Sequence, residues 1–252
     1  MSPTAFITGA TSGIGRETAK VLADLKYNLI ITGRRLVRLE MLKKELMPTG
    51  VQVTPLNFDI RDRSATVKAW ESLSEDLKTI DILVNNAGLA AGADPIQNGN
   101  EEDWDRMLDT NVKGLLNITK LIIPGMIKRN KGHIINISSI AGSEVYANGN
   151  VYCASKHAVQ ALTKGMRIDL LPHNIKVSSV SPGMVETEFS IVRYHGDTKA
   201  ADKVYQGLIP LKAEDVAEAI RFMVTRPDHV NINDLQIMPT AQASAIYNYR
   251  NQ

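Results

Sequence analysis

A glycine-rich turn near the N-terminus constrains the fold of this chain more than any other feature. The apolar segment 5–8 is typical of a short buried strand, the turn 9–15 follows it, and a helical pattern then runs to residue 25. Glycines let the backbone come close to a phosphate, and the unpaired N–H groups at a helix N-terminus point towards it. The turn therefore predicts a site for a dinucleotide pyrophosphate. Its Gly9, Gly13 and Gly15 depart from the commoner Gly-x-Gly-x-x-Gly spacing, and an ordinary tight turn is the alternative.

Strand and helix patterns alternate along the rest of the chain. Further strands are predicted at 28–32, 52–56, 82–84, 133–137, 176–180 and 235–238. Helical patterns are predicted at 36–46, 61–77, 101–129, 151–171 and 213–225, with a kink at Pro124 and Gly125. Such alternation favours right-handed βαβ units, whose parallel strands bind ligands at their carboxyl ends. We therefore predict an α/β fold with a Rossmann-like, doubly wound, seven-stranded parallel sheet and helices on both faces.

Length, charge and cysteine content narrow the classes of protein. A chain of 252 residues without repeats, low-complexity runs or linkers is expected to form one domain, residues 1–252. Its net charge of +2, from scattered charges, predicts no nucleic-acid partner and no membrane partner. A single cysteine, Cys153, excludes an internal disulfide framework and a multi-cysteine zinc site, and we predict no metal. The N-terminus lacks a secretory pattern and no apolar run nears the roughly 20 residues of a membrane span, so we expect a cytoplasmic protein.

Two arginines follow the second predicted strand. In NAD-binding folds an acidic residue near this point holds the ribose hydroxyls and would repel a 2′-phosphate. Here the carboxylate is missing, and Arg34 and Arg35 take its place. A hydrogen bond from a guanidinium to a phosphate contributes about 1.5–3 kcal/mol, so the pair predicts NADP rather than NAD. The alternative is that both arginines simply solvate the start of a helix.

A tyrosine and a lysine begin the predicted 151–171 helix. Tyr152 and Lys156 stand four residues apart, which places an ammonium beside a phenol on one helix face. A fixed cation stabilises a phenolate, so the tyrosine can exchange a proton with an alcohol or a carbonyl oxygen. The pair predicts one half of a carbonyl reduction, and a hydride from the dinucleotide is the other half. A solvated helix face is the alternative.

Two segments near the C-terminus have the character of loops. Residues 187–210 form a mixed, largely polar insertion after a strand end, which predicts a substrate lid containing Arg193. Residues 240–252 are expected to be a loosely held tail, which either frays or docks on another subunit through Tyr247 and Tyr249.

These motifs together resemble the short-chain dehydrogenase/reductase family over essentially the whole chain. The matching residues are Thr8-Gly9-x-x-x-Gly13-Ile14-Gly15, Asp59, Asn85-Asn86-Ala87-Gly88, Asn111, Ser139, Tyr152-x-x-x-Lys156 and Pro182-Gly183 with Thr187. Each motif alone is modest, but their joint order and spacing make a chance match improbable.

The resemblance implies a role for each matching residue. Tyr152 would be the general acid/base, and Ser139 would hydrogen-bond the reacting oxygen. Lys156 would lower the pKa of the tyrosine and hold the nicotinamide ribose. Asn111 would link Lys156 to solvent through a water. The cofactor contacts would come from Gly9, Thr11, Ser12, Gly13, Ile14, Gly15, Arg34, Arg35, Asp59, Ile60, Asn86, Ala87, Gly88, Tyr152, Lys156, Pro182, Gly183, Val185 and Thr187.

A narrower resemblance concerns the substrate. The segments 59–63, 111–115, 187–193 and 229–239 are similar to those of NADP-dependent 3-hydroxy acid dehydrogenases, which oxidise serine, allo-threonine and related acids and reduce malonic semialdehyde. Such substrates bear a carboxylate, and Arg193 is a plausible bidentate partner for it beside Ser139 and Tyr152, although a surface arginine is the alternative. The family also implies a homotetramer, in which the Asn111 and Tyr152 helices pack against their equivalents in a neighbouring subunit. Leu116, Leu121, Ala158 and Leu162 permit such packing, but they equally suit the core of a monomer.

Two rival functions stay open. One is a reductase of the same fold acting on 3-ketoacyl carrier, steroid or sugar substrates, which has no need of Arg193. The other is a sensor that binds NADP without turnover. A sensor usually has a broken catalytic set, whereas Asn111, Ser139, Tyr152 and Lys156 are all present here.

Overall fold

Seven parallel strands form the centre of the computed structural model, which describes residues 2–251. The strands are β1 (Thr4–Ile7), β2 (Asn28–Gly33), β3 (Val53–Asn57), β4 (Ile82–Asn85), β5 (Gly132–Ile137), β6 (Ile175–Pro182) and β9 (Asp234–Ile237). Their spatial order is β3-β2-β1-β4-β5-β6-β9. Because the order reverses between β1 and β4, a crevice opens there at the carboxyl ends of the strands. The predicted doubly wound parallel sheet is confirmed.

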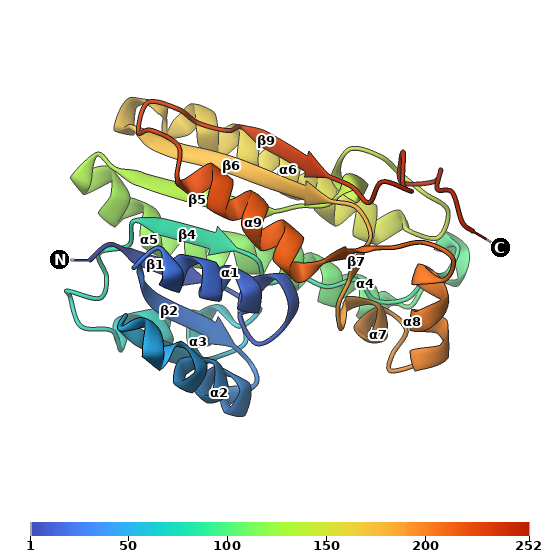
Figure 1. Cartoon of the computed structure of the whole chain (residues 1–252), viewed down its shortest axis with the longest axis horizontal. Coiled ribbons are helices and arrows are strands. Elements are labelled where there is room, and N and C mark those ends of the chain that lie inside the picture. The colour runs from blue at the N-terminus through green and yellow to red at the C-terminus, as the bar shows by residue number, and fades with distance from the viewer. Residues whose placement is uncertain (1, 252) are drawn as a thin grey trace.

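Helices cover both faces of the sheet (Figure 1). One layer contains α1 (Gly13–Asp24), α2 (Leu36–Leu46) and α9 (Ala213–Val224). The other contains α3 (Arg63–Glu71), α4 (Glu101–Leu108), α5 (Leu115–Arg129) and α6 (Asn150–Asp169). Short 3₁₀ turns occupy Met47–Thr49, Ile96–Asn98, Ile140–Gly142 and Leu171–His173. Beyond the carboxyl edge of the sheet lie α7 (Phe189–Arg193), α8 (Thr198–Tyr205) and a two-stranded ribbon of β7 (Val185–Glu186) and β8 (Leu211–Lys212).

Each face of the sheet has its own hydrophobic core. Leu22, Ile31 and Ile220 belong to the core under α1, α2 and α9, whereas Phe6 and Ile122 belong to the core under α3 and α5. Phe6 on β1 and Ile31 on the neighbouring β2 thus point to opposite faces of the sheet, and both are fully buried. Full burial of one such side chain stabilises the fold by about 1.5–3 kcal/mol. The two cores hold the strand ends, and therefore the site, in fixed positions.

The long helix predicted over 101–129 is interrupted at a different place from the one expected. Pro124 lies inside α5, which continues to Arg129, and the irregularity is a π-helical turn at Asp109–Gly114. The carbonyl four residues before the proline belongs to Lys120, which is exposed, so water can replace the missing N–H donor. The π-helical turn contains Asn111, a residue of the expected site.

Another helix also ends earlier than predicted. The helix predicted over 61–77 ends at Glu71, where the Ser72 hydroxyl donates to the carbonyl of Ala69. Leu73 and Leu77 lie in the turns after the helix and still pack on the core. The helical spacing of apolar residues therefore continues in the sequence beyond the end of the helix. Within residues 2–251, no helix combines the length and the apolar character that crossing a membrane would require.

Specific hydrogen bonds hold the C-terminal segment in place as far as residue 251. The expectation of a loosely held tail is therefore wrong. Gln242 is buried, and its side-chain oxygen accepts a hydrogen bond of 2.8 Å from the backbone N–H of Met184. Arg250 donates to the carbonyl of Val204 at 3.0 Å, and the N–H of Asn251 donates to the carbonyl of Gly207 at 2.7 Å. These contacts join the segment to the 187–210 insertion, which composition alone does not reveal.

Candidate active site

The glycine turn has a backbone that only glycine adopts readily. Gly9 and Gly13 have φ of +68° and +53°, in the left-handed region. A Cβ on Gly15 would collide with the Asn86 side chain and with the carbonyl of Gly9, so this glycine packs behind the turn. The helix that follows, α1, begins at Gly13, at the edge of the crevice. The turn is therefore shaped for a phosphate group.

Asn86 connects the glycine turn to the end of β4. Its side-chain amide donates to the carbonyls of Thr8 at 2.9 Å and Gly9 at 3.1 Å. In return, the Thr8 hydroxyl accepts hydrogen bonds of 2.9 Å from the N–H groups of Asn86 and Ala87. The two strand ends on either side of the crevice are thereby held together, which shapes the floor of the site.

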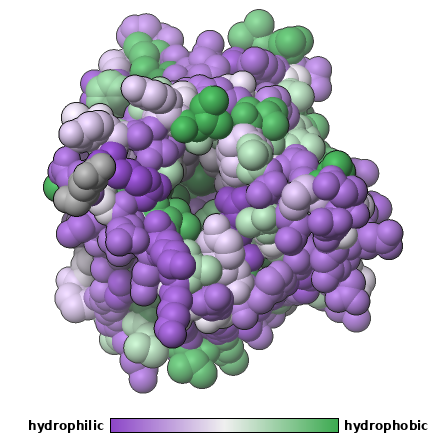
Figure 2. Space-filling model, turned by 90° about the vertical axis from the view of Figure 1, so that its right-hand side faces the viewer, coloured by the Kyte–Doolittle hydropathy of each residue, from purple (hydrophilic) through white to green (hydrophobic). Residues whose placement is uncertain are grey.

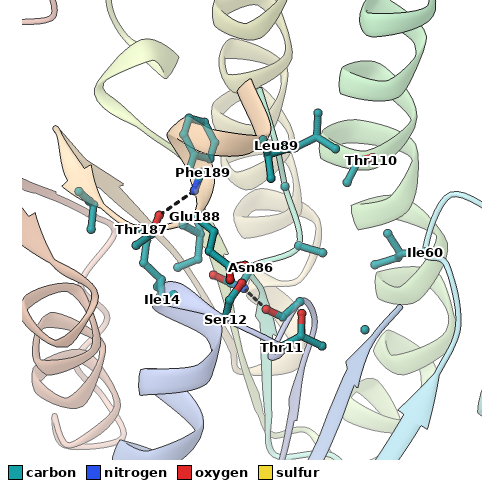
Figure 3. A pocket seen from close by; sticks show the side chains of 18 of the residues that line it. Thr11, Ser12, Ile14, Ile60, Asn86, Leu89, Thr110, Thr187, Glu188 and Phe189 are labelled. Atoms are coloured by element: carbon teal, nitrogen blue, oxygen red, sulfur yellow. Dashed lines mark hydrogen bonds between the residues drawn. The ribbon is translucent and has the colours of Figure 1, made fainter. Parts of the chain in front are cut away.

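One cavity of about 320 Å³ runs along the carboxyl ends of the strands. In Figure 3, Thr187, Glu188 and Phe189 lie on one side of it, and Ile60 and Thr110 lie on the other. Figure 2 views the molecule from this edge and shows a hollow with hydrophobic groups inside and mainly hydrophilic groups around it. The size and mixed lining are those of a small-molecule site.

The two arginines predicted to bind a phosphate line one end of this cavity. Arg35 donates to the Thr11 hydroxyl at 3.2 and 2.8 Å and to the Ser12 hydroxyl at 2.8 Å. Arg34 lies 3.8 Å from the carboxylate of Asp59, which also pairs with Arg61. Partial burial would raise the pKa of Asp59, but its hydrogen bonds with Arg61 outweigh burial and the pKa is lowered. This end of the cavity therefore has positive charge in excess.

Ser139, Tyr152 and Lys156 lie at the opposite end of the cavity, and all three are buried. Burial raises the pKa of Tyr152 above its usual range, against the opposing effects of a hydrogen bond with Ser139 and of the Arg193 guanidinium. Burial lowers the pKa of Lys156 to about 8. The Lys156 ammonium donates to the carbonyl of Ile137 at 2.9 Å and lies 6.0 Å from the centre of the Tyr152 ring. The expected lysine is thus beside the phenol, but the cation that lowers the phenol's pKa here is Arg193.

Asn111 is buried beneath this end of the cavity. Its side-chain oxygen accepts from the N–H of Leu89, and its amide donates to the carbonyl of Leu89, both at 2.8 Å. The same amide donates to the Ser155 hydroxyl at 2.9 Å. The contacts of Asn111 therefore hold the chain after β4 against α6, the helix that bears Tyr152.

Arg193 lies at the end of α7, against the tyrosine. Its guanidinium carbon is 6.0 Å from the centre of the Tyr152 ring and 5.4 Å from that of Tyr146. One guanidinium nitrogen donates to the Tyr146 hydroxyl at 2.9 Å, and another donates to the carbonyl of Gly92 at 3.3 Å. Nearby, His195 pairs with the buried carboxylate of Asp103 at 2.9 Å. The insertion therefore places a fixed positive charge beside Tyr152, although Arg193 itself is not among the residues that line the cavity.

Residues 3–196 match the family described as short chain dehydrogenase. The chain belongs to that family. It is 45% identical to the NADP-dependent 3-hydroxy acid dehydrogenase YdfG of Escherichia coli over 98% of this chain and 99% of the relative. It is 46% identical to sulfoacetaldehyde reductase 2 of Chromohalobacter salexigens over 96% of each. A solved structure described as the closed form of serine dehydrogenase complexed with NADP⁺ superposes with a TM-score of 0.91 at 44% identity, over 99% of this chain and 100% of that one.

The structure of this short-chain dehydrogenase brings most of the predicted cofactor-binding residues to the one cavity. Its lining includes Gly9, Thr11, Ser12, Gly13, Ile14, Arg34, Arg35, Asp59, Ile60, Asn86, Ala87, Gly88, Tyr152, Lys156, Pro182, Gly183, Val185 and Thr187. Gly15 packs behind the wall, and Asn111 lies beneath it.

Sequence reasoning missed several residues of the cavity lining. They are Thr32, Gly33, Phe58, Leu89, Thr110, Ile137, Ser138, Glu188, Phe189 and Val192. Leu89, Glu188 and Phe189 directly follow recognised motifs at strand ends, and that position was an available signal. Thr110 directly precedes the motif residue Asn111, but only the fold brings that side chain against the cavity.

Proposed function

We propose that this short-chain dehydrogenase transfers a hydride between NADP and a small 3-hydroxy acid or the matching 3-oxo acid. Substrates of the serine, allo-threonine and 3-hydroxypropionate/malonic semialdehyde type fit this description. One observation supports the proposal above all others. A single cavity has two arginines at one end and buried Ser139, Tyr152 and Lys156 at the other, so it fits a phosphorylated dinucleotide aligned with proton-transfer groups.

The residues of the cavity fit the cofactor along its length. Arg34 and Arg35 would bind the 2′-phosphate, and the glycine turn would bind the pyrophosphate. Thr110 lines the cavity, and its hydroxyl oxygen is buried without a hydrogen-bond partner among residues 2–251, which suits a polar ligand nearby. Lys156 would hold the nicotinamide ribose, and Thr187 would contact the nicotinamide end.

The chemistry divides between cofactor and protein. The nicotinamide supplies the two-electron chemistry by giving or accepting the hydride. Tyr152 would give a proton to the carbonyl oxygen in reduction and take one from the hydroxyl in oxidation, while Ser139 would donate a hydrogen bond to the same oxygen. Because burial keeps the pKa of Tyr152 raised, its phenol holds its proton at neutral pH, which suits reduction. Oxidation requires the phenolate, and the positive charge of Arg193 stabilises it.

The lid arginine supports the assignment to acidic substrates. Arg193 holds its charge beside Tyr152, and a guanidinium binds a carboxylate in two parallel hydrogen bonds. The similar proteins named for serine, 3-hydroxy acids and sulfoacetaldehyde all concern small molecules with an acidic group. We therefore propose that residues 187–210 form the substrate lid and that Arg193 binds the acidic group of the substrate.

The decisive experiment is a substrate comparison with purified protein. L-Serine and 3-hydroxypropionate would each be tested with NADP against their methyl esters, and again with NAD. We expect turnover of the acids with NADP and poor turnover of the esters. Turnover of the esters alone would refute the acid assignment and favour neutral carbonyl substrates. Tight NADP binding without turnover on a broad panel would favour the sensor.

We also propose that the chain acts as one domain that assembles into a homotetramer in the cytoplasm. Leu116 is 41% exposed on α5, and Leu121, Ala158 and Leu162 are partly exposed on α5 and α6, which supports a neighbouring subunit there. A buried Cys153 suits a reducing compartment. Light scattering after size exclusion tests the assembly: Leu116→Glu should dissociate it, and a monomeric wild-type protein would contradict the proposal.

A further inference from the structure

A carboxylate lies where a phosphate-binding site should repel one. Glu188 immediately precedes α7 and lines the cavity beside the arginines. One of its oxygens pairs with Arg35 at 2.7 Å, and the other pairs with Arg38 at 2.6 Å. Both arginines are about 150 residues distant in sequence, so the contact depends on the position of α7. Figure 3 shows Glu188 on the cavity wall between Thr187 and Phe189. A negative charge at this position would repel a bound phosphate unless it has another function.

The two edges of the Arg35 guanidinium have different partners. Its Nε and Nη2 donate to the hydroxyls of Thr11 and Ser12, at the rim of the glycine turn. Its Nη1 donates to Glu188 at 2.7 Å. Glu188 thus binds Nη1, whereas the Nε and Nη2 edge binds Thr11 and Ser12, which line the cavity. A long arginine side chain loses conformational entropy when it is ordered, and an arginine that is already ordered binds at a lower entropic cost.

The charges at this end of the cavity balance those of a phosphate. Arg34, Arg35, Arg38 and Arg61 against Asp59 and Glu188 leave two positive charges, and a phosphate monoester has about −1.5 to −2 at neutral pH. Partial burial would raise the pKa of Glu188, but its hydrogen bonds with Arg35 and Arg38 outweigh burial and lower the pKa. Glu188 therefore stays ionised at neutral pH, and its charge is already neutralised by two arginines.

We propose that Glu188 is a positioning residue for cofactor discrimination. It holds Arg35 with its Nε and Nη2 edge towards Thr11 and Ser12, where the 2′-phosphate would bind, and it ties that arginine to the start of α7. This inference rests on the proposed use of NADP. Because α7 also bears Phe189 and Arg193, recognition of the phosphate is joined to the position of the lid over the substrate.

Fluorescence titration with NADPH and NADH tests the proposal without any turnover. Glu188→Gln should weaken NADPH binding about three- to tenfold, the size expected for two partly exposed ion pairs, and should change NADH binding less than twofold. Glu188→Asp keeps the charge on a shorter side chain and should restore part of the loss. The matched control is Glu186→Gln, an exposed residue of the same segment, which should bind both cofactors as the wild type does.

Three results would overturn the proposal. Unchanged or tighter NADPH binding in Glu188→Gln would show that the carboxylate is idle or repels the phosphate. Equal weakening of NADPH and NADH, in a variant with wild-type thermal stability, would show a structural role in the lid. A wild-type protein that binds both cofactors equally would refute the proposed NADP specificity as well, which separates that failure from the failure of Glu188 alone.

Discussion

Replacing Arg193 with glutamine should abolish the distinction between an acidic substrate and its ester. The guanidinium stands 6.0 Å from the centre of the Tyr152 ring, within reach of a small acid bound at the phenol. A hydrogen bond to a charged group contributes about 1.5–3 kcal/mol, so kcat/KM for L-serine should fall about ten- to a hundredfold. Arg193 also lowers the pKa of Tyr152, so its loss should slow oxidation of the ester as well, by a smaller factor. The acid-to-ester ratio isolates the carboxylate contact from that second effect.

The assay is NADP reduction at saturating cofactor with L-serine and its methyl ester, for wild type and variant. Arg226→Gln is the matched control, because that guanidinium also stacks on an aromatic ring, Phe222 at 4.3 Å, but on α9 and the turn after it. The control should keep the wild-type ratio. An Arg193→Gln enzyme that keeps the acid-to-ester ratio of the wild type would refute the carboxylate-binding role.

Three further predictions concern the catalytic tyrosine, the cofactor and the core. Tyr152→Phe should keep NADPH binding and lose most turnover, and an unchanged kcat would refute proton transfer by the phenol. Alanine at both Arg34 and Arg35 should weaken NADP binding much more than NAD binding in a fluorescence titration; equal weakening would count against 2′-phosphate recognition. Burial lowers the pKa of His133 to about 3, so below about pH 6.5 the unfolded chain takes up a proton that the folded chain does not. The stability from neutral His133 is therefore full above pH 6.5 and declines by about 1.4 kcal/mol per pH unit towards pH 3. Denaturant melts at pH 7.5 and 5 should show about 2 kcal/mol less loss in His133→Asn than in the wild type, and equal losses would contradict this reasoning.

Local sequence patterns were enough to predict the strands, the glycine turn and most of the helices. Buried strands read as apolar runs because both faces of a parallel sheet are covered, as Phe6 and Ile31 illustrate. The glycine turn was predictable because a positive φ and a close backbone approach both demand glycine, as at Gly9 and Gly13. Helix ends were less predictable, since Leu73 and Leu77 pack on the core without being helical.

Contacts between distant segments could not be predicted in the same way. The pairing of Glu188 with Arg35 and Arg38, and the stacking of Arg193 beside Tyr152, depend on where α7 comes to lie. The hydrogen bond from the backbone of Met184 to Gln242, which ties down the C-terminal segment, is of the same kind. Each is made by polar side chains that are common on surfaces and have no periodicity.

The sequence by itself therefore determined the sheet, the position of the crevice and the residue types that meet there, because hydrophobic burial and backbone stereochemistry act locally along the chain. Only the tertiary structure decided the electrostatics of the site. The pKa of a buried phenol or ammonium depends on every charge and dipole within a few ångströms, whichever segment supplies it. Sequence spacing placed Lys156 beside Tyr152, but folding placed Arg193 there as well, and it is the Arg193 charge that lowers the pKa of the phenol.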